Sequence, residues 1–256
     1  MRRLVIESDY HCGSQVGLVP HGHRSCGKRG EHQKELWNFR RKVLKSLQPI
    51  DFLVVNGDCI DGKGEASGGT ELVTTDRHKQ AEMAAEAIDL AKANECGLVY
   101  GTAYHTGKTE DFEDAVASIC KTPKAFVSGQ EFFKYHGVTF DFKHFVEASG
   151  IPHGRHTAIA KEKLWNLIWA DRGGQPKVDY VVRSHVHYHS GVFDKYYTGF
   201  TTPCWQGHGS KFGVRKCAGT VDIGLMVLEF GKKGVVDACY GIFADLEQQV
   251  ARVTVR

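Results

Sequence analysis

Side chains that can bind metal ions follow three of the apolar runs in this chain. The runs and their polar neighbours are residues 4–6 with Asp9 and His11, residues 52–55 with Asp58, and residues 180–182 with His185 and His187. Each run has the length and composition of a short buried strand, so the polar residues are expected in the loops at the strand ends. Carboxylate oxygens and neutral imidazole nitrogens suit Mn²⁺, Fe, Zn²⁺ or Ni²⁺.

The spacing of these residues suits a shared metal centre. Asp9 and His11 can direct a carboxylate and an imidazole at one ion. His185 and His187 can do the same, because alternate side chains of an extended segment face one way. A carboxylate such as that of Asp58, at the end of a central strand, can bridge two ions. Three strand ends that converge with such side chains predict a metal cluster, and a metal cluster usually supports hydrolysis.

Periodicity in the first half of the chain predicts alternating strands and helices. Strands are expected at residues 2–8, 52–55 and 98–100, and helices at about 31–47, 76–94 and 110–119. This order implies right-handed crossovers and parallel strand pairing. The carboxyl ends of parallel strands meet at one edge of the sheet, which is where α/β proteins place their binding sites.

The second half of the chain has a different pattern. The later elements are expected at residues 132–142 (a hairpin), 158–170 (a helix), 178–183 (a strand), and 221–230 and 234–243 (antiparallel strands). The hairpin turns at His136-Gly137 and leads to the isolated His144. No linker divides the chain, so residues 1–256 are expected to form a single domain.

Composition is that of an ordinary water-soluble protein. Hydrophobic residues make up 41% of the 256 residues and charged residues 25%. No apolar run approaches the roughly 18 residues that a membrane span needs. The start of the chain turns polar too quickly for a signal peptide, so a cytoplasmic protein with no membrane partner is expected. The eight cysteines form no C-x-x-C pair and are expected to be reduced thiols.

The net charge of +3 permits a phosphate-bearing substrate without indicating one. The densest basic stretch lies between Arg24 and Lys45. It has two open interpretations, a nucleic-acid contact or the solvated face of a helix. Trp205 offers a similar choice between a stacking surface for a base and plain packing. Three further tryptophans lie in helical context and are expected in the core: Trp37, Trp165 and Trp169.

In their order along the chain, the motifs resemble those of the calcineurin-like metallophosphoesterases. The family pattern is D-x-H, G-D, G-N-H-D/E, a lone His and G-H-x-H. The matching segments are Asp9 with His11, Gly57-Asp58, residues 101–105, His144, and His185 with His187. The resemblance spans roughly residues 4–190. It implies an α/β fold, a four-layer αββα sandwich of two mixed β-sheets flanked by helices, with the C-terminal strands in the second sheet.

The resemblance also implies a role for each matched residue. One divalent ion would be held by Asp9, His11 and His187, a second ion by His144 and His185, and both by the bridging Asp58. The expected cofactors are two Mn²⁺ ions, with Fe, Zn²⁺ and Ni²⁺ as alternatives.

Two positions depart from the family pattern. Ser184 replaces the glycine before His-x-His, which is an exchange of one small residue for another. In residues 101–105, Thr102 stands where the family has a metal-binding Asn, and His105 comes two positions late. We expect His105 to be a functional residue, either as a general acid or as a replacement ligand of the second ion.

The expected activity is phosphoester hydrolysis, in which a metal-bridging hydroxide attacks phosphorus. The first hypothesis is a phosphodiesterase or nuclease, whose partner is a phosphoester substrate, with nucleic acid as one such substrate. A phosphomonoesterase or protein phosphatase is the alternative within the superfamily. An alternative of another class is a non-catalytic binding module with the same fold. The altered third motif favours the module, and the retention of every other ligand opposes it.

Overall fold

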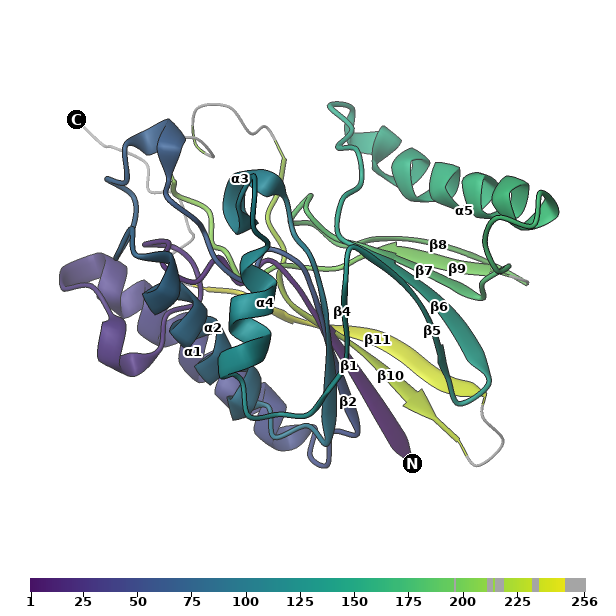
Figure 1. The fold of residues 1–256 in the computed structure, drawn as a ribbon, viewed down its shortest axis with the longest axis horizontal. Helices are drawn as coiled ribbons and strands as arrows, with labels where there is room; N and C mark the ends of the chain where they lie inside the picture. Colours follow the sequence, from purple (N-terminus) through teal and green to yellow (C-terminus); the bar gives the residue numbers. More distant parts are fainter. Residues whose placement is uncertain (196, 211–213, 215–218, 232–234, 247–256) are drawn as a thin grey trace.

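The computed structural model describes residues 1–195, 197–210, 214, 219–231 and 235–246 (Figure 1). The strands of these residues form one sheet of six strands and one of five. The expected strand start at residue 234 lies outside the described residues. Among the described helices, none combines the length and the apolar composition that crossing a bilayer would need.

The first sheet is built around the N-terminal strand. Its strands are β1 (Arg2–Glu7), β2 (Phe52–Asn56), β3 (Glu95–Val99), β4 (Lys124–Ser128), β10 (Ile223–Phe230) and β11 (Val236–Ala244). Their order across the sheet is β11-β10-β1-β2-β3-β4. Strands β1 to β4 are parallel, whereas β10 pairs antiparallel with both β1 and β11. The predicted parallel pairing of the first three strands is confirmed.

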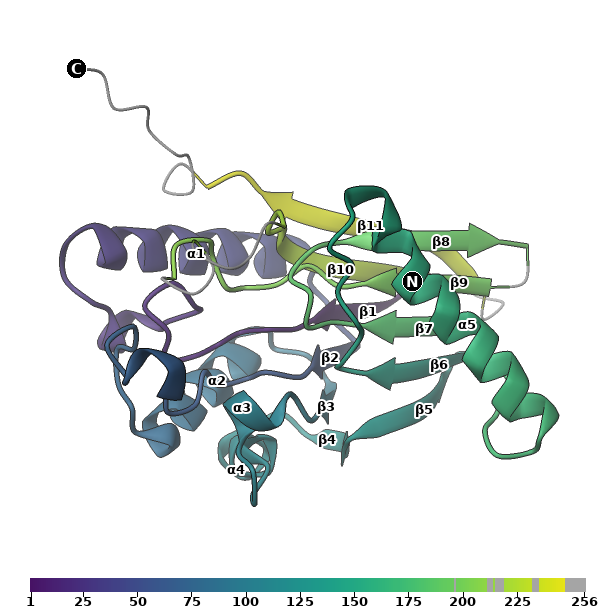
Figure 2. The ribbon, with the colours of Figure 1, turned by 90° about the horizontal axis from the view of Figure 1, so that it is seen from above.

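Three helices cover the outer face of the first sheet (Figures 1 and 2). They are α1 (Gly27–Ser46), α2 (Arg77–Leu90) and α4 (Phe112–Ile119). Because side chains alternate along a strand, Val5 of β1 packs in the core beneath these helices, whereas Leu4 and Ile6 pack in the core between the sheets. The same strand therefore contributes to two cores.

The second sheet has the order β5-β6-β7-β9-β8 and is also mixed. Its strands are β5 (Gln130–Tyr135), β6 (Val138–Lys143), β7 (Tyr180–Arg183), β8 (Ser190–Asp194) and β9 (Tyr197–Thr201). Helix α5 (Arg155–Asp171) covers its outer face (Figures 1 and 2). The short helices are α3 (Ala103–Thr106), η1 (His21–His23), η2 (Glu65–Ser67) and η3 (Pro152–Gly154).

Aromatic side chains fill the space between the two sheets. Phe52 comes from β2, Phe140 and Phe142 from β6, Phe200 from β9 and Phe230 from β10, and each is at most 1% exposed. Burial of one such side chain contributes about 1.5–3 kcal/mol before the entropy of ordering it is counted. The sheets are thus held face to face, and the predicted αββα sandwich of two mixed sheets flanked by helices is confirmed.

The C-terminal strands belong to the first sheet, so the expectation that they join the second sheet is wrong. Strand β10 pairs with β1 from Arg2 opposite Phe230 to Ile6 opposite Met226. Strand β1 lies inside the molecule, and an inner strand needs a hydrogen-bonding neighbour on each side. Strand β2 supplies one neighbour and β10 the other. The sequence pattern also omits β4, β8 and β9, which have five residues each.

Helix α5 places Ile159 and two polar side chains on its inner side, and its large aromatic side chains face solvent. Trp165 is 56% exposed and Trp169 is 47% exposed, so the expectation that they lie in the core is wrong. On the inner side, Glu162 accepts a hydrogen bond from Arg183, and Asn166 bonds the backbone of the segment before β7. Together with the buried Ile159, these contacts define the inner side of the helix, and both tryptophans lie outside it.

Candidate metal centre

Strand ends from both sheets bring the candidate ligands together. Asp9 and His11 follow β1, Asp58 follows β2, His144 follows β6, and His185 and His187 follow β7. Among the described residues, three groups have ligand atoms within 4.8 Å of one another: Asp9–His11–His187, Asp58–His144–His185 and His11–Asp61–His105. The first two groups together contain all six residues that the sequence proposes as metal ligands.

The backbone is left-handed at five of these six residues. The φ angle is 51° at Asp9, 44° at His11, 50° at Asp58, 72° at His185 and 58° at His187. Only two other non-glycine residues of the described chain share this property. A residue with a side chain takes such angles rarely, at a cost of roughly 1–2 kcal/mol. Local strain of this kind gathers at functional sites.

The first group surrounds one oxygen of Asp9. Its Oδ1 lies 3.7 Å from His11 Nε2, 3.3 Å from His187 Nε2 and 3.8 Å from His144 Nε2. The Nε2 atoms of His11 and His187 are 3.2 Å apart. One carboxylate oxygen and several imidazole nitrogens thus face a common point.

Asp58 lies between the groups. Its Oδ2 is 3.1 Å from His144 Nε2, and 4.0 Å from both His11 Nε2 and His105 Nε2. Its Oδ1 accepts hydrogen bonds from Thr102, at 2.7 Å from the backbone N–H and at 3.3 Å from the hydroxyl. Thr102 therefore orients the carboxylate so that Oδ2 faces the histidines of both groups.

Two buried atoms of the cluster lack a partner that a cation would supply. Asp9 Oδ1 and His144 Nε2 make no hydrogen bond to any described residue. His144 Nδ1 donates to the Asn56 carbonyl at 2.6 Å, and because a carbonyl only accepts, Nε2 is the atom that offers a lone pair when the ring is neutral. A buried acceptor left without a partner costs about 1–3 kcal/mol. This set of carboxylate and imidazole lone pairs fits divalent ions such as Mn²⁺, Fe²⁺ or Zn²⁺.

A hydrogen-bond network behind the cluster holds the other oxygen of Asp9. The Ser8 hydroxyl donates to Asp9 Oδ2 at 2.6 Å, and the His185 N–H donates to it at 3.3 Å. The Thr202 hydroxyl lies 2.7 Å from the hydroxyls of both Ser8 and Ser184. Ser184, which takes the glycine position of the family pattern, is therefore part of a polar link between the two sheets.

The altered third motif forms helix α3 beside the cluster. A Cβ atom at Gly101 would lie 2.0 Å from Asp58 Oδ1, so only glycine lets the end of β3 approach this carboxylate. The helical turn that follows carries His105 back to the site. Its ring centroid is 4.5 Å from that of His11, and its side chain is 19% exposed. The structure therefore brings His105 to the cluster despite the shift of two positions.

Asp61 is part of the site, although the sequence interpretation omitted it. Its Oδ1 accepts hydrogen bonds from His11 Nδ1 at 2.9 Å and from Gln206 Nε2 at 3.2 Å. Its backbone carbonyl accepts one from His105 Nδ1 at 2.9 Å. Both histidines are thereby held with Nε2 toward the cluster. The signal in the sequence is the D-x-x-D spacing of Asp58 and Asp61 within one loop.

Burial and neighbouring charges set the protonation of the carboxylates. Burial opposes the ionisation of Asp9, but the charges of His144 and His187 outweigh it and hold the pKa of Asp9 well below its usual range. The pKa of Asp58 is lowered in the same way, since His144 and His105 outweigh its burial. Both carboxylates are therefore ionised at neutral pH, as a metal ligand must be.

The histidines divide into two kinds. Burial lowers the pKa of His105, and the charge of Asp58 offsets only part of this effect. His11 is buried too, yet Asp61 and Asp9 raise its pKa to about 10. Despite burial, Asp58 and Asp9 raise the pKa of His144 to about 9. Without metal, protonated His11 and His144 balance the charge of the carboxylates. A metal ion needs the neutral rings, so metal binding is expected to release protons.

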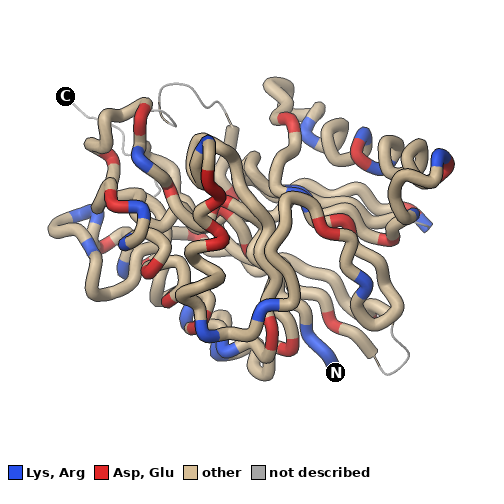
Figure 3. Tube along the Cα trace, in the orientation of Figure 1, with Lys and Arg blue, Asp and Glu red and all other residues tan. Residues whose placement is uncertain are grey.

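The residues considered for nucleic-acid contact are either buried or located on helix α1. Trp205 is fully buried, so the packing interpretation is confirmed and the stacking surface is wrong. The basic stretch coincides with α1, where Lys28 and Arg41 are exposed but Arg40 is buried. Figure 3 shows Lys and Arg interspersed with Asp and Glu along the trace rather than gathered on one face. Neither feature marks a path for nucleic acid.

No family model and no curated protein match the chain. It is similar to a solved archaeal phosphodiesterase, at 12% identity over 94% of this chain and 99% of that one, with a TM-score of 0.47. It is also similar to Vps29 from Chaetomium thermophilum, at 8% identity over 95% and 98%, with a TM-score of 0.49. A third similar structure is Vps29 from Entamoeba histolytica in complex with zinc, at 12% identity over 94% and 98%, with a TM-score of 0.46. These proteins have the calcineurin-like metallophosphoesterase fold, the family that the sequence resembles. At such identities and TM-scores, the similarities assign no activity, ligand or partner to this chain.

Proposed function

We propose that the chain is a two-metal phosphoester hydrolase that acts on phosphodiesters. The observation that carries the proposal is the pair of ligand groups, Asp9–His11–His187 and Asp58–His144–His185, which meet at Asp58. A structural site for a single ion would use one such group. Two adjacent groups that meet at one carboxylate are the arrangement of two-metal hydrolases.

Each group would hold one divalent ion, and Asp58 would contribute to both. When bound, the ions would activate a water molecule and offset negative charge on the phosphoryl oxygens. We propose Mn²⁺ as the ion, with Fe, Zn²⁺ and Ni²⁺ as alternatives that the same ligand types accept.

We assign proton transfer to His105. Its Nδ1 is fixed by the carbonyl of Asp61 at 2.9 Å, which leaves Nε2 as the atom that faces the cluster. Placed there, Nε2 can exchange a proton with the leaving oxygen of an ester. The alternative, in which His105 is a further metal ligand, is supported by the group His11–Asp61–His105. A leaving-group series separates the two, because only a proton donor matters less for good leaving groups.

Two separate cavities, one beside His105 and one beside Phe145, support a diester over a monoester. A cavity of about 180 Å³ is lined by His105 and its neighbours on the α3 side. A second cavity, of about 240 Å³, lies along α5 and is lined by Phe145, whose ring centroid is 4.9 Å from that of His185. A phosphodiester carries two ester groups and can place one in each cavity, whereas a monoester has only one such group.

The deciding experiment compares bis-p-nitrophenyl phosphate with p-nitrophenyl phosphate in the presence of Mn²⁺. We expect the diester to be hydrolysed with the higher kcat/KM. Asp58→Asn should remove the activity and reduce bound metal, because a neutral amide bridges two cations poorly. Asp171→Asn, an exposed substitution at the end of α5, is the matched control. Preference for the monoester would overturn the diesterase assignment.

A non-catalytic binding module is the second candidate. It is favoured by Thr102, which hydrogen-bonds Asp58 where the family pattern has a metal ligand. Two bound ions with turnover of neither substrate would support this candidate over the hydrolase.

We further propose a single domain in a reducing, cytoplasmic setting. The seven cysteines of the described chain are free thiols, as is usual in such a compartment.

A further inference from the structure

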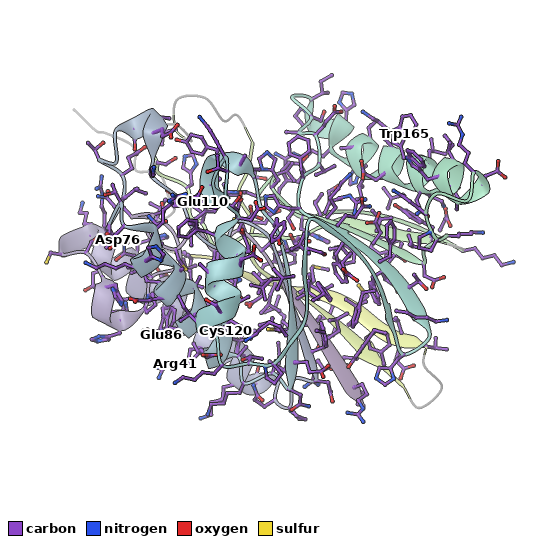
Figure 4. The ribbon with its side chains drawn as sticks, viewed as in Figure 1. Arg41, Asp76, Glu86, Glu110, Cys120 and Trp165 are labelled. Atoms are coloured by element: carbon purple, nitrogen blue, oxygen red, sulfur yellow. The ribbon has the colours of Figure 1, made fainter. Side chains whose placement is uncertain are left out.

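The cavity between α5 and the segment after β6 is the feature from which we infer a substrate preference. Its volume is about 240 Å³. One wall is formed by Lys143, Phe145 and Glu147, and the facing wall by Lys161, Glu162 and Trp165 of α5. Figure 4 shows Trp165 on α5, on the side of the molecule away from α1 and α2.

Phe145 connects the lining of this cavity to the metal centre. Phe145 directly follows the candidate ligand His144. Its ring centroid lies 4.9 Å from that of His185, the neighbouring candidate ligand. A group joined by one ester bond to a phosphate at the cluster would therefore pass Phe145 before it reached Trp165.

Two large aromatic side chains line this cavity while remaining open to solvent. Phe145 is 51% exposed and Trp165 is 56% exposed. Trp165 is exposed because the inner side of α5 is taken by Ile159, Glu162 and Asn166. Uncovered aromatic rings beside a polar centre are a surface on which a planar ring can stack, because both partners then lose contact with water.

The charged groups of the cavity are paired with each other. Lys143 Nζ lies 3.2 Å from Glu162 Oε2, and Lys161 Nζ lies 2.8 Å from Glu147 Oε2. The walls therefore carry no excess positive charge for a second phosphate. The cavity suits an uncharged planar group, whose edge can accept hydrogen bonds from the two ammonium groups.

We propose that this cavity binds an aromatic ring of the substrate. The ring belongs to the ester group that stays bonded to phosphorus when the other ester group leaves. The proposal rests on the proposed function, since it places the ring relative to a phosphate at the metal centre. The ring is either a nucleobase or a simple aryl group, which share the stacking chemistry and differ in hydrogen-bonding edges.

The test uses three diesters with p-nitrophenolate as the common leaving group and methyl, phenyl or thymidine 5′ as the retained group. In the wild type we expect kcat/KM for the phenyl and thymidine esters to exceed that for the methyl ester by about tenfold, the effect of one stacked ring. A higher value for thymidine than for phenyl identifies a nucleobase, and equal values identify an aryl group.

The variants locate the ring. Trp165→Ala should reduce the ratio of aromatic to methyl kcat/KM toward one, and Trp165→Phe should restore most of it. Trp169→Ala is the matched control, because Trp169 is exposed on the same helix but does not line the cavity, and its ratio should equal that of the wild type. An unchanged ratio in Trp165→Ala, or no preference in the wild type, overturns the proposal.

A binding measurement keeps this result separate from the proposed function. Phenyl phosphate should quench the tryptophan fluorescence of the Mn²⁺-loaded wild type, and Trp165→Phe should lose that quenching. If no diester is hydrolysed but this quenching is present, the hydrolase assignment fails and the ring site stands. If the diesters are hydrolysed without ring preference or quenching, the ring site fails alone.

Discussion

At the centre of the site, histidines are oriented by the ring nitrogen that points away from the cluster. His144 Nδ1 bonds the Asn56 carbonyl, and His11 and His105 both bond Asp61. Such contacts fix the tautomer and ring orientation and increase the basicity of the coordinating nitrogen. Asp61 thus serves two histidines without being one of the six proposed ligands.

We predict that Asp61→Ala weakens Mn²⁺ binding by about 10–100-fold, because His11 loses its hydrogen-bond acceptor. Asp61→Asn should weaken binding less, since the amide oxygen can still accept from His11 Nδ1. Calorimetric titration of the metal-free protein measures both effects, with Asp171→Asn as the control. Equal affinities for the wild type and Asp61→Ala would show that His11 needs no support from Asp61.

For single residues, the spacing of motifs in the sequence predicted which side chains belong to the site. Contacts between residues far apart in the chain could not be predicted in this way. Asp9, His11 and Asp58 could be predicted because each stands at a fixed distance after an apolar strand. The D-x-x-D spacing places Asp61 near Asp58 but does not give its role, which comes from a 2.9 Å contact with His11, a residue 50 positions away. Trp205 is the opposite case. A tryptophan side chain can stack on a base, but Trp205 is fully buried and cannot reach one.

The loop that follows β1 is held in place by helix α1. Arg40 of α1 is fully buried and forms a two-pronged ion pair with Glu7, at 2.9 and 2.7 Å. It also donates to the Ala87 carbonyl of α2 and to the hydroxyl of Tyr10. Tyr10 lies between Asp9 and His11 in the chain, so this network joins two helices to the first metal-binding loop.

We predict that Arg40→Met lowers the free energy of unfolding by about 3–5 kcal/mol, because it leaves Glu7 buried without its partner. Arg41→Met, an exposed change on the same helix (Figure 4), should stay within about 0.5 kcal/mol of the wild type. Denaturant unfolding monitored by circular dichroism measures both. The double variant Glu7→Leu with Arg40→Met should recover stability, and a failure to recover would place the loss in packing rather than in the unpaired charge.

Elements with a strong local pattern could be predicted, and their partners could not. The apolar runs of β1 and β2 and the spacing within α1 are local properties. The pairing of β10 with β1 joins residues more than two hundred positions apart. The amino-acid pattern of β10 predicts a strand but does not specify which strand it pairs with. The prediction for α5 was wrong because Glu162 and Asn166 take part in its inner contacts beside Ile159, and its tryptophans are exposed.

Across the whole molecule, the cluster joins the two sheets. Asp9 and Asp58 follow strands of the first sheet, whereas His144, His185 and His187 follow strands of the second. A cation shared by these groups would link the sheets at the end where the aromatic core between them stops. Metal binding is therefore expected to contribute to the stability of the entire fold.

We predict that Mn²⁺ raises Tm by roughly 5–10 °C when present at about 100 times its Kd. The reason is that the ligand side chains are brought together only in the folded chain. EDTA should reverse the shift. Asp58→Asn should show a much smaller shift, and calorimetry should show one transition for both sheets. A second transition that does not respond to the metal would contradict the linkage of the two sheets.

We also predict that His32 makes the protein sensitive to mild acid. Burial lowers the pKa of His32 on α1 below the usual value of about 6.5. Below that value the unfolded chain binds a proton that the folded chain excludes, so stability falls as pH decreases from about 6.5 toward 5. One such group changes the unfolding free energy by at most about 1.4 kcal/mol per pH unit.

His32→Leu should therefore flatten the loss of stability between pH 7 and 5 in the presence of EDTA. His21→Gln, at an exposed position, is the control. Denaturant midpoints measured at each pH test the idea, and identical slopes for His32→Leu and the wild type would assign the acid sensitivity to other groups.

The left-handed backbone at five of the proposed ligands has an evolutionary consequence. At those positions the chain geometry suits glycine, and the aspartates and histidines remain only while their side chains are needed. A descendant released from selection for metal chemistry would gain stability by exchanging them for glycine or asparagine. Loss of the ligands would then be rapid and hard to reverse, because each return step would first make the protein less stable. Among relatives of this chain, we therefore expect intact and fully eroded clusters to be common, and clusters lacking one or two ligands to be rare.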